Sequence, residues 1–325
     1  MLLRQRNILF NFWIFIQKPL KFAGRFHLVR ELFHDLPGDV VQLVWASGFR
    51  RFIAALPTER GRSDHYSLFA LIERWMDTTH TFHTRVGELT ISPMSFSAIT
   101  GLAFGGTPVP FDIGYCHLSE GTRGQYVCDL LGFLPAWKNR KNVVLSSLVE
   151  SFKRLPTTTP RQIIQKARCF LLILLGTTLF CETGHEVSIA LLSPLRDLDR
   201  VATFDWGSAA LSYLYYRLDT VCRGAVTMCG FWHVLHVGSF HPFHRFHPLH
   251  YFLLLMYFFQ IWGIEIGLIR GFSAISLDRS LPLMQRWGSS RLSSSRYGLQ
   301  TYREQLNSLE WDLVRKIISL VFYKS

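Results

Sequence analysis

The chain is long, apolar enough to bury a large core, and basic. It has 325 residues, 49% hydrophobic and 18% charged, which excludes a disordered tail and leaves room for one large domain or two ordinary ones. The net charge of +12 rests on 27 Arg and 8 Lys, and guanidinium groups suit phosphate and carboxylate partners. The six cysteines stand at wide, unpatterned spacings. We therefore expect reduced thiols, with neither a disulfide framework nor a CxxC metal site.

The first predicted elements are short helices. Residues 40–56 carry apolar side chains at helical spacing, and Gly48 divides them into two pieces. Ser63 or Asp64 is placed to cap the helix that follows. The inward stripe predicted for that helix is Leu68, Leu71, Ile72 and Trp75.

The apolar period then changes from helical to alternating. Residues 80–91, HTFHTRVGELTI, alternate about Gly87, which predicts a short β-hairpin ended by Pro93. A short helix is expected over Ser95–Leu102, and the Gly- and Pro-rich stretch 105–124 is expected to be a surface loop.

Helices dominate the second half of the chain as well. Residues 142–155 are amphipathic, and Thr159 followed by Pro160 is a start signal for a helix that should be buried by its last turns. Asp205 is placed to cap another helix, and a last one is expected over 299–322. The sequence thus predicts a mainly α fold: a single large helical domain with one small β-hairpin element.

Two apolar runs imitate membrane or targeting segments. Residues 8–16 follow two arginines but lack a small-residue cleavage site, so a secretory signal is not favoured. Residues 251–268 carry Gln260 and Glu265, and an ionisable group inside a bilayer span costs several kcal/mol. We expect a buried helix there and keep membrane anchoring by Tyr251 to Leu268 as an alternative.

Histidines form the most conspicuous cluster of metal-ligand types. Pro242 and Pro248 prevent these side chains from sharing one helical face, and no carboxylate partners stand nearby, so an exposed loop is favoured over a metal site. The residues of this run are His233, His236, His241, His244, His247 and His250.

Other ligand types lie in two separate segments. His80 and His83 lack the HExxH spacing, and Asp197 and Asp199 stand in a charged stretch where carboxylates commonly cap helices. We predict structural roles, no catalytic residue, no metal and no cofactor. A metal-dependent hydrolase or nuclease that uses these four residues is the enzymatic alternative.

No nucleotide-binding or nucleophile motif occurs in the chain: GxxxxGK[ST], GxGxxG after a strand and GxSxG are all missing. The basic residues instead form several clusters. Together with the net charge they make nucleic acid a second class of partner beside proteins, and no small-molecule substrate is predicted. The clusters are Arg50-Arg51, Arg60 to Arg62, Lys138 to Lys141 and Arg286 to Arg303.

Three blocks of the sequence agree in order and spacing with one family. They are Leu68 to Leu102, Lys166 to Leu218, and Arg286 to Arg291 with Tyr302 to Val314. They contain E-R-W, H-T-F-H and G-E-L-T, then L-R-D-L-D and W-G-S-A, then R-W-G-S-S-R. In these features the chain resembles the plant mobile domain family of MAINTENANCE OF MERISTEMS-like proteins, also labelled aminotransferase-like plant mobile domain. The signature residues are Arg74, Trp75, His80, Thr81, Phe82, His83, Gly87, Glu88, Arg196, Asp197, Asp199, Trp206, Gly207 and Ser208.

The resemblance implies a nuclear protein that acts in gene and transposon silencing, genome integrity and meristem maintenance, with chromatin proteins as partners. It supplies no catalytic residues. The aminotransferase label implies pyridoxal phosphate on a lysine, yet none of the eight lysines stands in a recognisable cofactor motif, so that activity is not supported. Some relatives carry a fused phosphatase domain, and its metal-binding motifs do not occur here.

The resemblance also divides the chain. Residues 1–35 are expected to form a basic and aromatic leader, and residues 36–325 the plant mobile domain. The segment between Leu235 and Gln260, HVGSFHPFHRFHPLHYFLLLMYFF, departs from the family pattern. We interpret residues 236–259 as a lineage-specific insertion or as translated non-coding sequence.

Overall fold

The computed structural model describes residues 20–56, 65–84, 87–182, 184–235, and 300, 303, 304 and 307. Within them the fold is mainly α, as predicted from the sequence. The longer helices are α2 (Phe26–His34), α3 (Gly38–Val44), α4 (Arg50–Ala55), α5 (His65–Ile72), α6 (Pro93–Thr100), α7 (Glu120–Leu131), α8 (Leu145–Arg154), α9 (Pro160–Thr177) and α11 (Trp206–Cys222).

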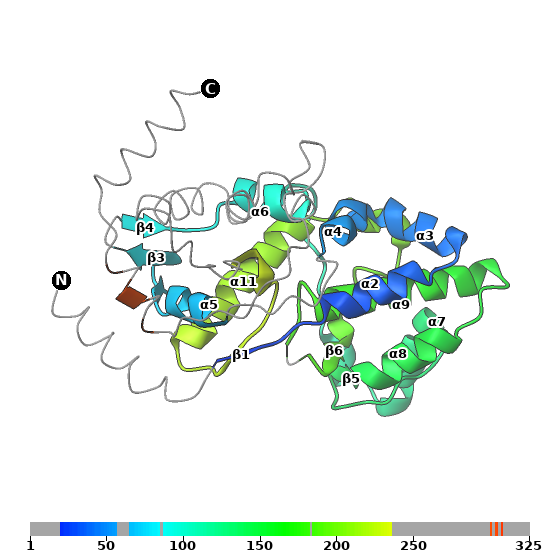
Figure 1. Cartoon of the computed structure of the whole chain (residues 1–325). Helices are drawn as coiled ribbons and strands as arrows, with labels where there is room; N and C mark the ends of the chain where they lie inside the picture. Colours follow the sequence, from blue (N-terminus) through cyan, green and yellow to red (C-terminus); the bar gives the residue numbers. More distant parts are fainter. Residues whose placement is uncertain are drawn as a thin grey trace, which may run out of the picture.

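The helices form two groups (Figure 1). One surrounds α9, which contacts α2, α3, α7 and α8. The other surrounds α11, which contacts α5, α6 and the strand β2 (Trp75–Met76). One continuous hydrophobic cluster joins the two groups, so the described part of the chain has a shared core.

Helix α9 begins at the residues that the sequence predicts. The Thr159 hydroxyl accepts from the Gln162 amide, and the Gln162 side chain accepts from the Thr159 amide at 3.2 Å, which completes a capping box ahead of Pro160. Every residue from Ala167 to Thr177 is buried. A helix that is buried on all sides is the central element of its group, because its neighbours must cover it completely.

Helix α11 is capped by Asp205, whose carboxylate accepts from the Ser208 amide at 2.8 Å. Trp206 donates its indole N–H to the Val201 carbonyl at 2.8 Å. Gly207 lies against the backbone of Ala103 and the ring of Phe104, and no side chain fits between them. These contacts fix the start of the helix against the chain that leaves α6.

The strands are short and form three small sheets in the described residues. The predicted hairpin is present as β3 (Thr81–Thr84) and β4 (Gly87–Leu89), and β2 pairs with β3 as a third strand. The expectation of one β element is therefore corrected, because two further pairs occur. The strand β1 (Lys21–Phe22) runs parallel to β7 (Thr227–Met228), and β5 (Asn142–Val144) is antiparallel to β6 (Glu186–Ser188).

The two helical pieces predicted around Gly48 are observed. Helices α3 and α4 flank a π-helical turn, Trp45–Phe49, in which Gly48 has a φ of 86°. Residues with a Cβ rarely adopt this left-handed backbone conformation. The glycine therefore lets the chain kink where Phe49 and Phe52 enter the core.

Several predicted boundaries are wrong. Trp75 does not continue the helix that ends at Ile72; it lies in β2, where it is still buried. Pro93 follows the hairpin and also begins the next helix. Ser92 accepts from the Ser95 amide as N-cap, and Pro93 is the first residue of α6, where it needs no N–H donor.

The stretch 105–124 is not a loop throughout. It contains a 3-10 turn, Gly114–His117, and the first residues of α7, which Ser119 caps by accepting from the Thr122 amide at 3.2 Å. Gly121 and Gly124 suggested a loop, but the cap and the buried residues of α7 outweigh their low helix propensity. The predicted amphipathic segment 142–155 likewise opens with β5 before α8 begins.

Part of the predicted leader packs on the core. Residues 20–34 contain β1 and α2, and α2 contacts α9. Trp232 donates its indole N–H to the Ala23 carbonyl at 2.5 Å, which fastens β1 to the segment after β7.

All six cysteines lie in the described residues, and they are free thiols, as predicted.

Most of the histidine run and several predicted segments fall on residues that the structure does not describe. His233 is buried in the 3-10 turn Trp232–Leu235, against the ring of Phe26. The other histidines of the run, the segment 236–259, the apolar runs 8–16 and 251–268, and most of 299–322 lie outside the described residues. No described helix is long and apolar enough to cross a membrane.

Gly207→Ala should destabilise the fold although alanine is the better helix former. A Cβ at position 207 collides with the Ala103 carbonyl and the Phe104 ring, and overpacking of this kind costs about 1–3 kcal/mol. Urea denaturation measures the change. Gly121→Ala in α7 is the control, because its Cβ meets no atom within 4 Å. Equal effects of the two substitutions would contradict the close contact at Gly207.

Candidate functional site

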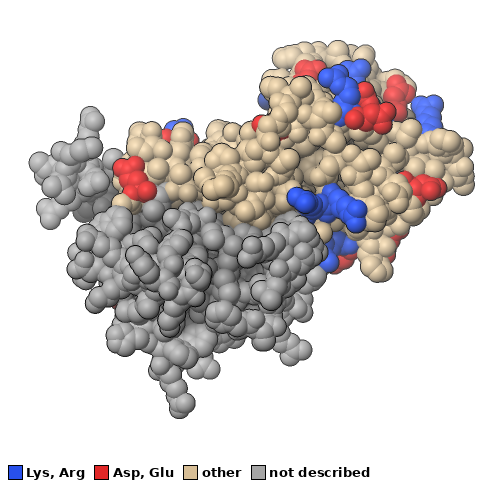
Figure 2. All heavy atoms as spheres, turned by 90° about the horizontal axis from the view of Figure 1, so that it is seen from above, with Lys and Arg blue, Asp and Glu red and all other residues tan. Residues whose placement is uncertain are grey.

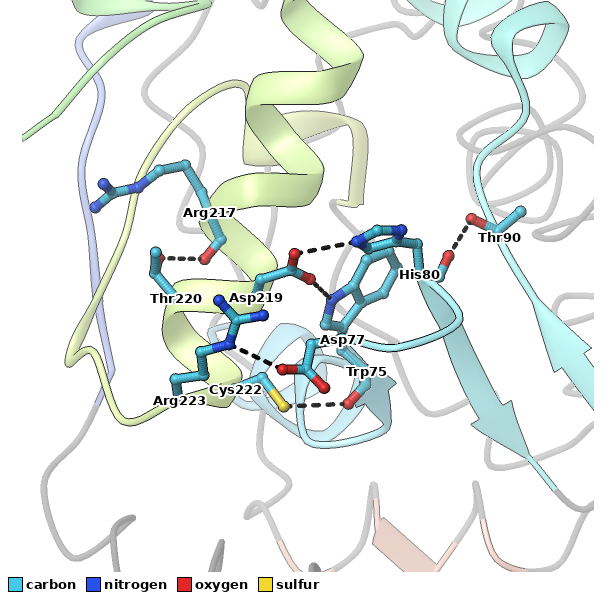
Figure 3. Close-up of polar contacts among 9 residues, drawn as sticks. All are labelled: Trp75, Asp77, His80, Thr90, Arg217, Asp219, Thr220, Cys222 and Arg223. Atoms are coloured by element: carbon cyan, nitrogen blue, oxygen red, sulfur yellow. Dashed lines mark hydrogen bonds and ion pairs between the residues drawn. The ribbon is translucent and has the colours of Figure 1, made fainter.

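The signature residues of the first block meet α11 at a buried carboxylate. Trp75 donates its indole N–H to Asp219 Oδ1 at 2.7 Å, and His80 Nε2 lies 3.1 Å from Asp219 Oδ2 (Figure 3). Trp75 is 3% exposed and Asp219 is 8% exposed, whereas the side chain of His80 is 48% exposed. The carboxylate is thus shared between a buried donor and a ring that reaches solvent.

A tyrosine and a threonine hold this arrangement from the side. The ring of Tyr215 stacks on His80 with centroids 5.7 Å apart, and its hydroxyl donates to the Ile91 carbonyl at 2.6 Å. Thr90 donates to the His80 carbonyl at 2.8 Å and lies 2.8 Å from the Tyr215 hydroxyl. His80 has a positive φ of 54°, and these contacts stabilise that uncommon backbone conformation.

The two sides of the β2–β3–β4 sheet differ. Trp75 and Phe82 are cross-strand partners with ring centroids 4.8 Å apart, and Phe82 is fully buried. The opposite side carries Thr81, whose hydroxyl donates to Glu88 at 3.1 Å, and His83, whose Nε2 lies 3.6 Å from the same carboxylate. One side of the sheet therefore packs on the core, and the other presents a polar surface to water.

The end of α11 is tied to the strand β2 by two more contacts. Arg223 donates to Asp77 at 2.9 Å, and this ion pair raises the pKa of the arginine. The thiol of Cys222 lies 3.6 Å from the Trp75 carbonyl, and burial raises its pKa. A thiol with a raised pKa is a poor nucleophile, so Cys222 packs as a small apolar group. Arg217 extends from the same helix away from Asp219 (Figure 3).

Glu73 and Arg74 of the E-R-W motif contact the third block. Arg303 donates through Nε to Glu73 Oε2 at 2.8 Å and through Nη2 to Oε1, which is a bidentate pair. Arg74 Nη2 donates to Asn307 Oδ1 at 2.6 Å, and burial lowers the pKa of Arg74. The first and third blocks of the resemblance are thus in direct contact.

The second block positions α10 (Leu198–Val201) and α11. Asp197 accepts from the Asp199 amide at 3.1 Å as the N-cap of α10, which is the capping role predicted from the sequence. The Arg196 carbonyl accepts from Arg168 Nη2 at 3.1 Å. In this block the Asp197 side chain therefore caps a helix, and Arg196 contributes its backbone carbonyl to the fold.

The pKa of the Asp205 carboxyl is set by opposing effects. Burial raises it, but the hydrogen bonds from the Ser208 amide and hydroxyl and from Gly105 outweigh burial, so the pKa lies below its usual value. Charge on Asp205 therefore stabilises the fold above the usual carboxyl pKa, and this stabilisation is lost as the pH falls through the lowered value.

The histidines and the aspartates of the enzymatic alternative make their contacts with different groups. His80 lies against Asp219, His83 against Glu88, and Asp197 against the amide of Asp199. In the described part of the chain no three His, Cys, Asp or Glu side chains gather as metal ligands would. The geometry therefore gives this quartet no common centre.

Sequence reasoning missed two residues that organise the fold. Asp219 follows the last residue of the second block, yet its position one turn after Tyr215 on an inward-facing stripe was a usable signal. Arg168 is 7% exposed and donates to the carbonyls of Leu195 at 2.8 Å, Leu130 at 2.6 Å and Arg196. Burial lowers its pKa, and three carbonyl acceptors stabilise the charge in place of a carboxylate.

Comparison with known proteins finds one family across most of the chain. The family model described as plant mobile domain matches residues 51–315. No solved structure matches the chain.

The relatives that the chain resembles are proteins of Arabidopsis thaliana. It is 33% identical over 215 residues to "Protein MAIN-LIKE 2", and the matched region covers 62% of the chain and 31% of that protein. It is 33% identical over 183 residues to "Protein MAINTENANCE OF MERISTEMS", covering 53% of the chain and 37% of the relative. It is 35% identical over 191 residues to "Serine/threonine-protein phosphatase 7 long form homolog", covering 54% and 14%. The matched segments thus span about a third or less of each of these relatives.

Trp75→Phe should destabilise the protein by about 1–3 kcal/mol, because it leaves a buried carboxylate oxygen of Asp219 without its N–H donor. Urea denaturation followed by circular dichroism measures the loss. Trp45→Phe is the matched control: Trp45 is half-buried and contacts Arg50 through its ring face. A loss at Trp75 no larger than at Trp45 would contradict the bond.

Asp205→Ala should destabilise the protein by about 1 kcal/mol at pH 7, because α11 loses its N-cap acceptor. The lowered pKa of Asp205 predicts that this cost is complete above the ordinary carboxyl pKa and shrinks as the pH falls from there through the lowered pKa of Asp205. Denaturation at a series of pH values tests this. Asp205→Asn keeps an acceptor that does not titrate, and a pH-independent cost in the alanine variant would contradict the account.

Proposed function

The chain belongs to the plant mobile domain family, and from this premise we propose that it is a non-enzymatic nuclear module that binds proteins and nucleic acid. In this proposal it acts in gene and transposon silencing, genome integrity and meristem maintenance. Its partners are chromatin proteins, with nucleic acid as the second class, and it uses no cofactor.

The observation that carries the proposal is the use of the signature side chains within the fold. The Trp75 indole N–H and the His80 ring are both directed at Asp219, and Thr90 at the backbone of His80 (Figure 3). A reactive site directs its nucleophile and base towards a common point where substrate sits. In a binding module, the signature residues need only stabilise the fold that presents the binding surface. The contacts of Trp75, His80 and Thr90 stabilise the fold in this way.

Charge supports the nucleic-acid part of the proposal. The chain carries a net +12, and phosphate contacts by Lys and Arg provide most of non-specific nucleic-acid affinity. On the face in Figure 2 the basic side chains stand in separate groups among acidic ones, over a largely uncharged surface. This distribution favours nucleic-acid binding through a local group of basic residues over binding through one broad basic face.

The names of the relatives support the biological part. A protein named MAINTENANCE OF MERISTEMS shares 33% identity with the chain over 183 residues, and MAIN-LIKE 2 shares as much over 215. The phosphatase named among the relatives is matched over only 14% of its length. Its name therefore lends no phosphatase activity to this proposal.

Complementation in plants tests the proposal. In Arabidopsis thaliana lacking MAINTENANCE OF MERISTEMS, the tagged chain should be recovered with nuclei and should lower transposon transcripts and restore meristem growth. A chain that stays out of the nucleus, or that changes neither transcripts nor meristems, would contradict it.

A variant separates binding from catalysis in the same plants. His83→Gln with Asp197→Asn and Asp199→Asn removes three candidate ligands or bases of the enzymatic alternative. Asparagine still caps α10, so the fold is kept. We expect complementation equal to wild type within about twofold. Loss of complementation by this variant, folded by circular dichroism, would favour a hydrolase or nuclease.

A further inference from the structure

A tight turn before β5 presents three cations on a rigid support. Lys138, Arg140 and Lys141 are all exposed, and they stand within four consecutive residues. Trp137 and Val143 form an antiparallel bridge on either side of them. The turn leads into the β5–β6 sheet, which lies apart from β3 and β4 in Figure 1.

The side chain of Asn139 closes this turn. Its Oδ1 accepts from the amides of Lys141 at 2.8 Å and Asn142 at 2.9 Å, which is an Asx turn. The Lys138 amide donates to the Asn142 carbonyl at 2.9 Å. The backbone conformation that displays the three cations is therefore fixed by local hydrogen bonds.

Two further contacts fasten the turn to the body of the protein. The Lys141 carbonyl accepts from the Ile189 amide at 2.9 Å and from the Tyr115 hydroxyl at 3.1 Å. At the base of the turn, the guanidinium of the buried Arg123 lies 4.8 Å from the centre of the Trp137 ring. This cation–π contact holds Trp137 and adds a fourth positive charge beneath the surface.

In the described part of the chain, the exposed cations of the turn have no ion-pair partner: no carboxylate lies within ion-pair distance of Lys138, Arg140 or Lys141. The nearest acidic side chains in the hydrogen-bond network, Glu182 and Glu186, are directed at the Asn142 amide group at 3.2 and 3.0 Å. They accept from Asn142 at the base of the turn, and the three cations are exposed to solvent.

We propose that the turn formed by Lys138, Asn139, Arg140 and Lys141 is a contact site for the phosphodiester backbone of nucleic acid. This proposal rests on the proposed function and names the element that performs its nucleic-acid part. Phosphate contacts need cations at fixed positions and carry no base specificity. The turn supplies three cations on a preorganised backbone, so little backbone entropy is lost on binding.

The chemistry of the turn favours a polyelectrolyte over an acidic protein surface. Duplex DNA carries one charge per about 1.7 Å of its axis, so all three cations of a compact turn find phosphates at once. Each phosphate contact also releases condensed counterions, which an ordinary acidic patch on a protein does not hold. An acidic protein partner is the competing outcome of the test below.

The experiment measures binding of fluorescein-labelled 20-bp duplex DNA and 20-nucleotide RNA to the full chain by anisotropy, from 0.05 to 0.3 M salt. The test variant is Lys138→Ala with Arg140→Ala and Lys141→Ala. The matched control is Lys21→Ala with Lys153→Ala and Arg161→Ala, which removes three exposed cations from β1, α8 and α9. Labelled polyglutamate of equal charge is the probe for an acidic protein surface.

We expect the test variant to lower the slope of log affinity against log salt by about 2 to 3 and the affinity at 0.1 M salt by about tenfold or more, with the control close to wild type. A loss seen equally on duplex DNA and RNA indicates backbone recognition as such; a loss confined to one indicates which nucleic acid the turn contacts.

Three results would overturn the proposal. Equal effects of test and control variants would show that bulk charge, not the turn, binds nucleic acid, and the proposed function would stand. An equal loss on polyglutamate would show that the turn binds carboxylate polyanions as well as phosphodiesters, and the assignment to nucleic acid would fall. No retention of either nucleic acid by the wild-type chain at 0.05 M salt would remove the nucleic-acid part of the proposed function together with the turn.

Discussion

Burial of one carboxylate constrains the half of the fold that surrounds α11. Asp219 is 8% exposed, and an ionised carboxylate removed from water must be hydrogen-bonded or paired. Trp75 and His80 meet that requirement from the strand β2 and from the turn before β3. The sheet therefore has one position on α11, and Tyr215 and Thr90 complete the contact. The E-R-W, H-T-F-H and G-E-L-T motifs are thus parts of one contact between a sheet and a helix.

The other half of the fold has a comparable constraint of opposite charge. Arg168 lies on the fully buried helix α9, and its guanidinium donates to three carbonyls at the ends of neighbouring segments. It therefore joins the end of α7 to the chain that leads into α10. A planar group that donates from three separate nitrogens suits this role, whereas the three donors of a lysine all stand on one nitrogen. The L-R-D-L-D motif is held in place partly by a residue that lies well before it in the sequence.

Periodicity and capping signals predict what is local in this protein. The helix after Thr159 and the helix after Asp205 begin where a cap residue precedes an apolar run, and Gly48 kinks the chain where expected. Failures arise where tertiary contacts decide. Trp75 fits the helical stripe but lies in a strand, where its ring packs on Phe82 and its indole N–H donates to Asp219. Helix α7 forms although it contains Gly121 and Gly124. Asp219 itself has no motif, because its partners are more than 130 residues away.

The hydrogen bond between Trp75 and Asp219 is the contact through which the signature residues hold the fold. A double-mutant cycle of Trp75→Phe and Asp219→Ala, read by urea denaturation, measures the interaction free energy of that pair directly, because each substitution removes one partner of the hydrogen bond. We expect a coupling of about 1–3 kcal/mol, because the two side chains share a buried hydrogen bond. Additive effects within about 0.5 kcal/mol would mean that the two residues do not act through that bond. That bond would then not be the contact that holds the fold.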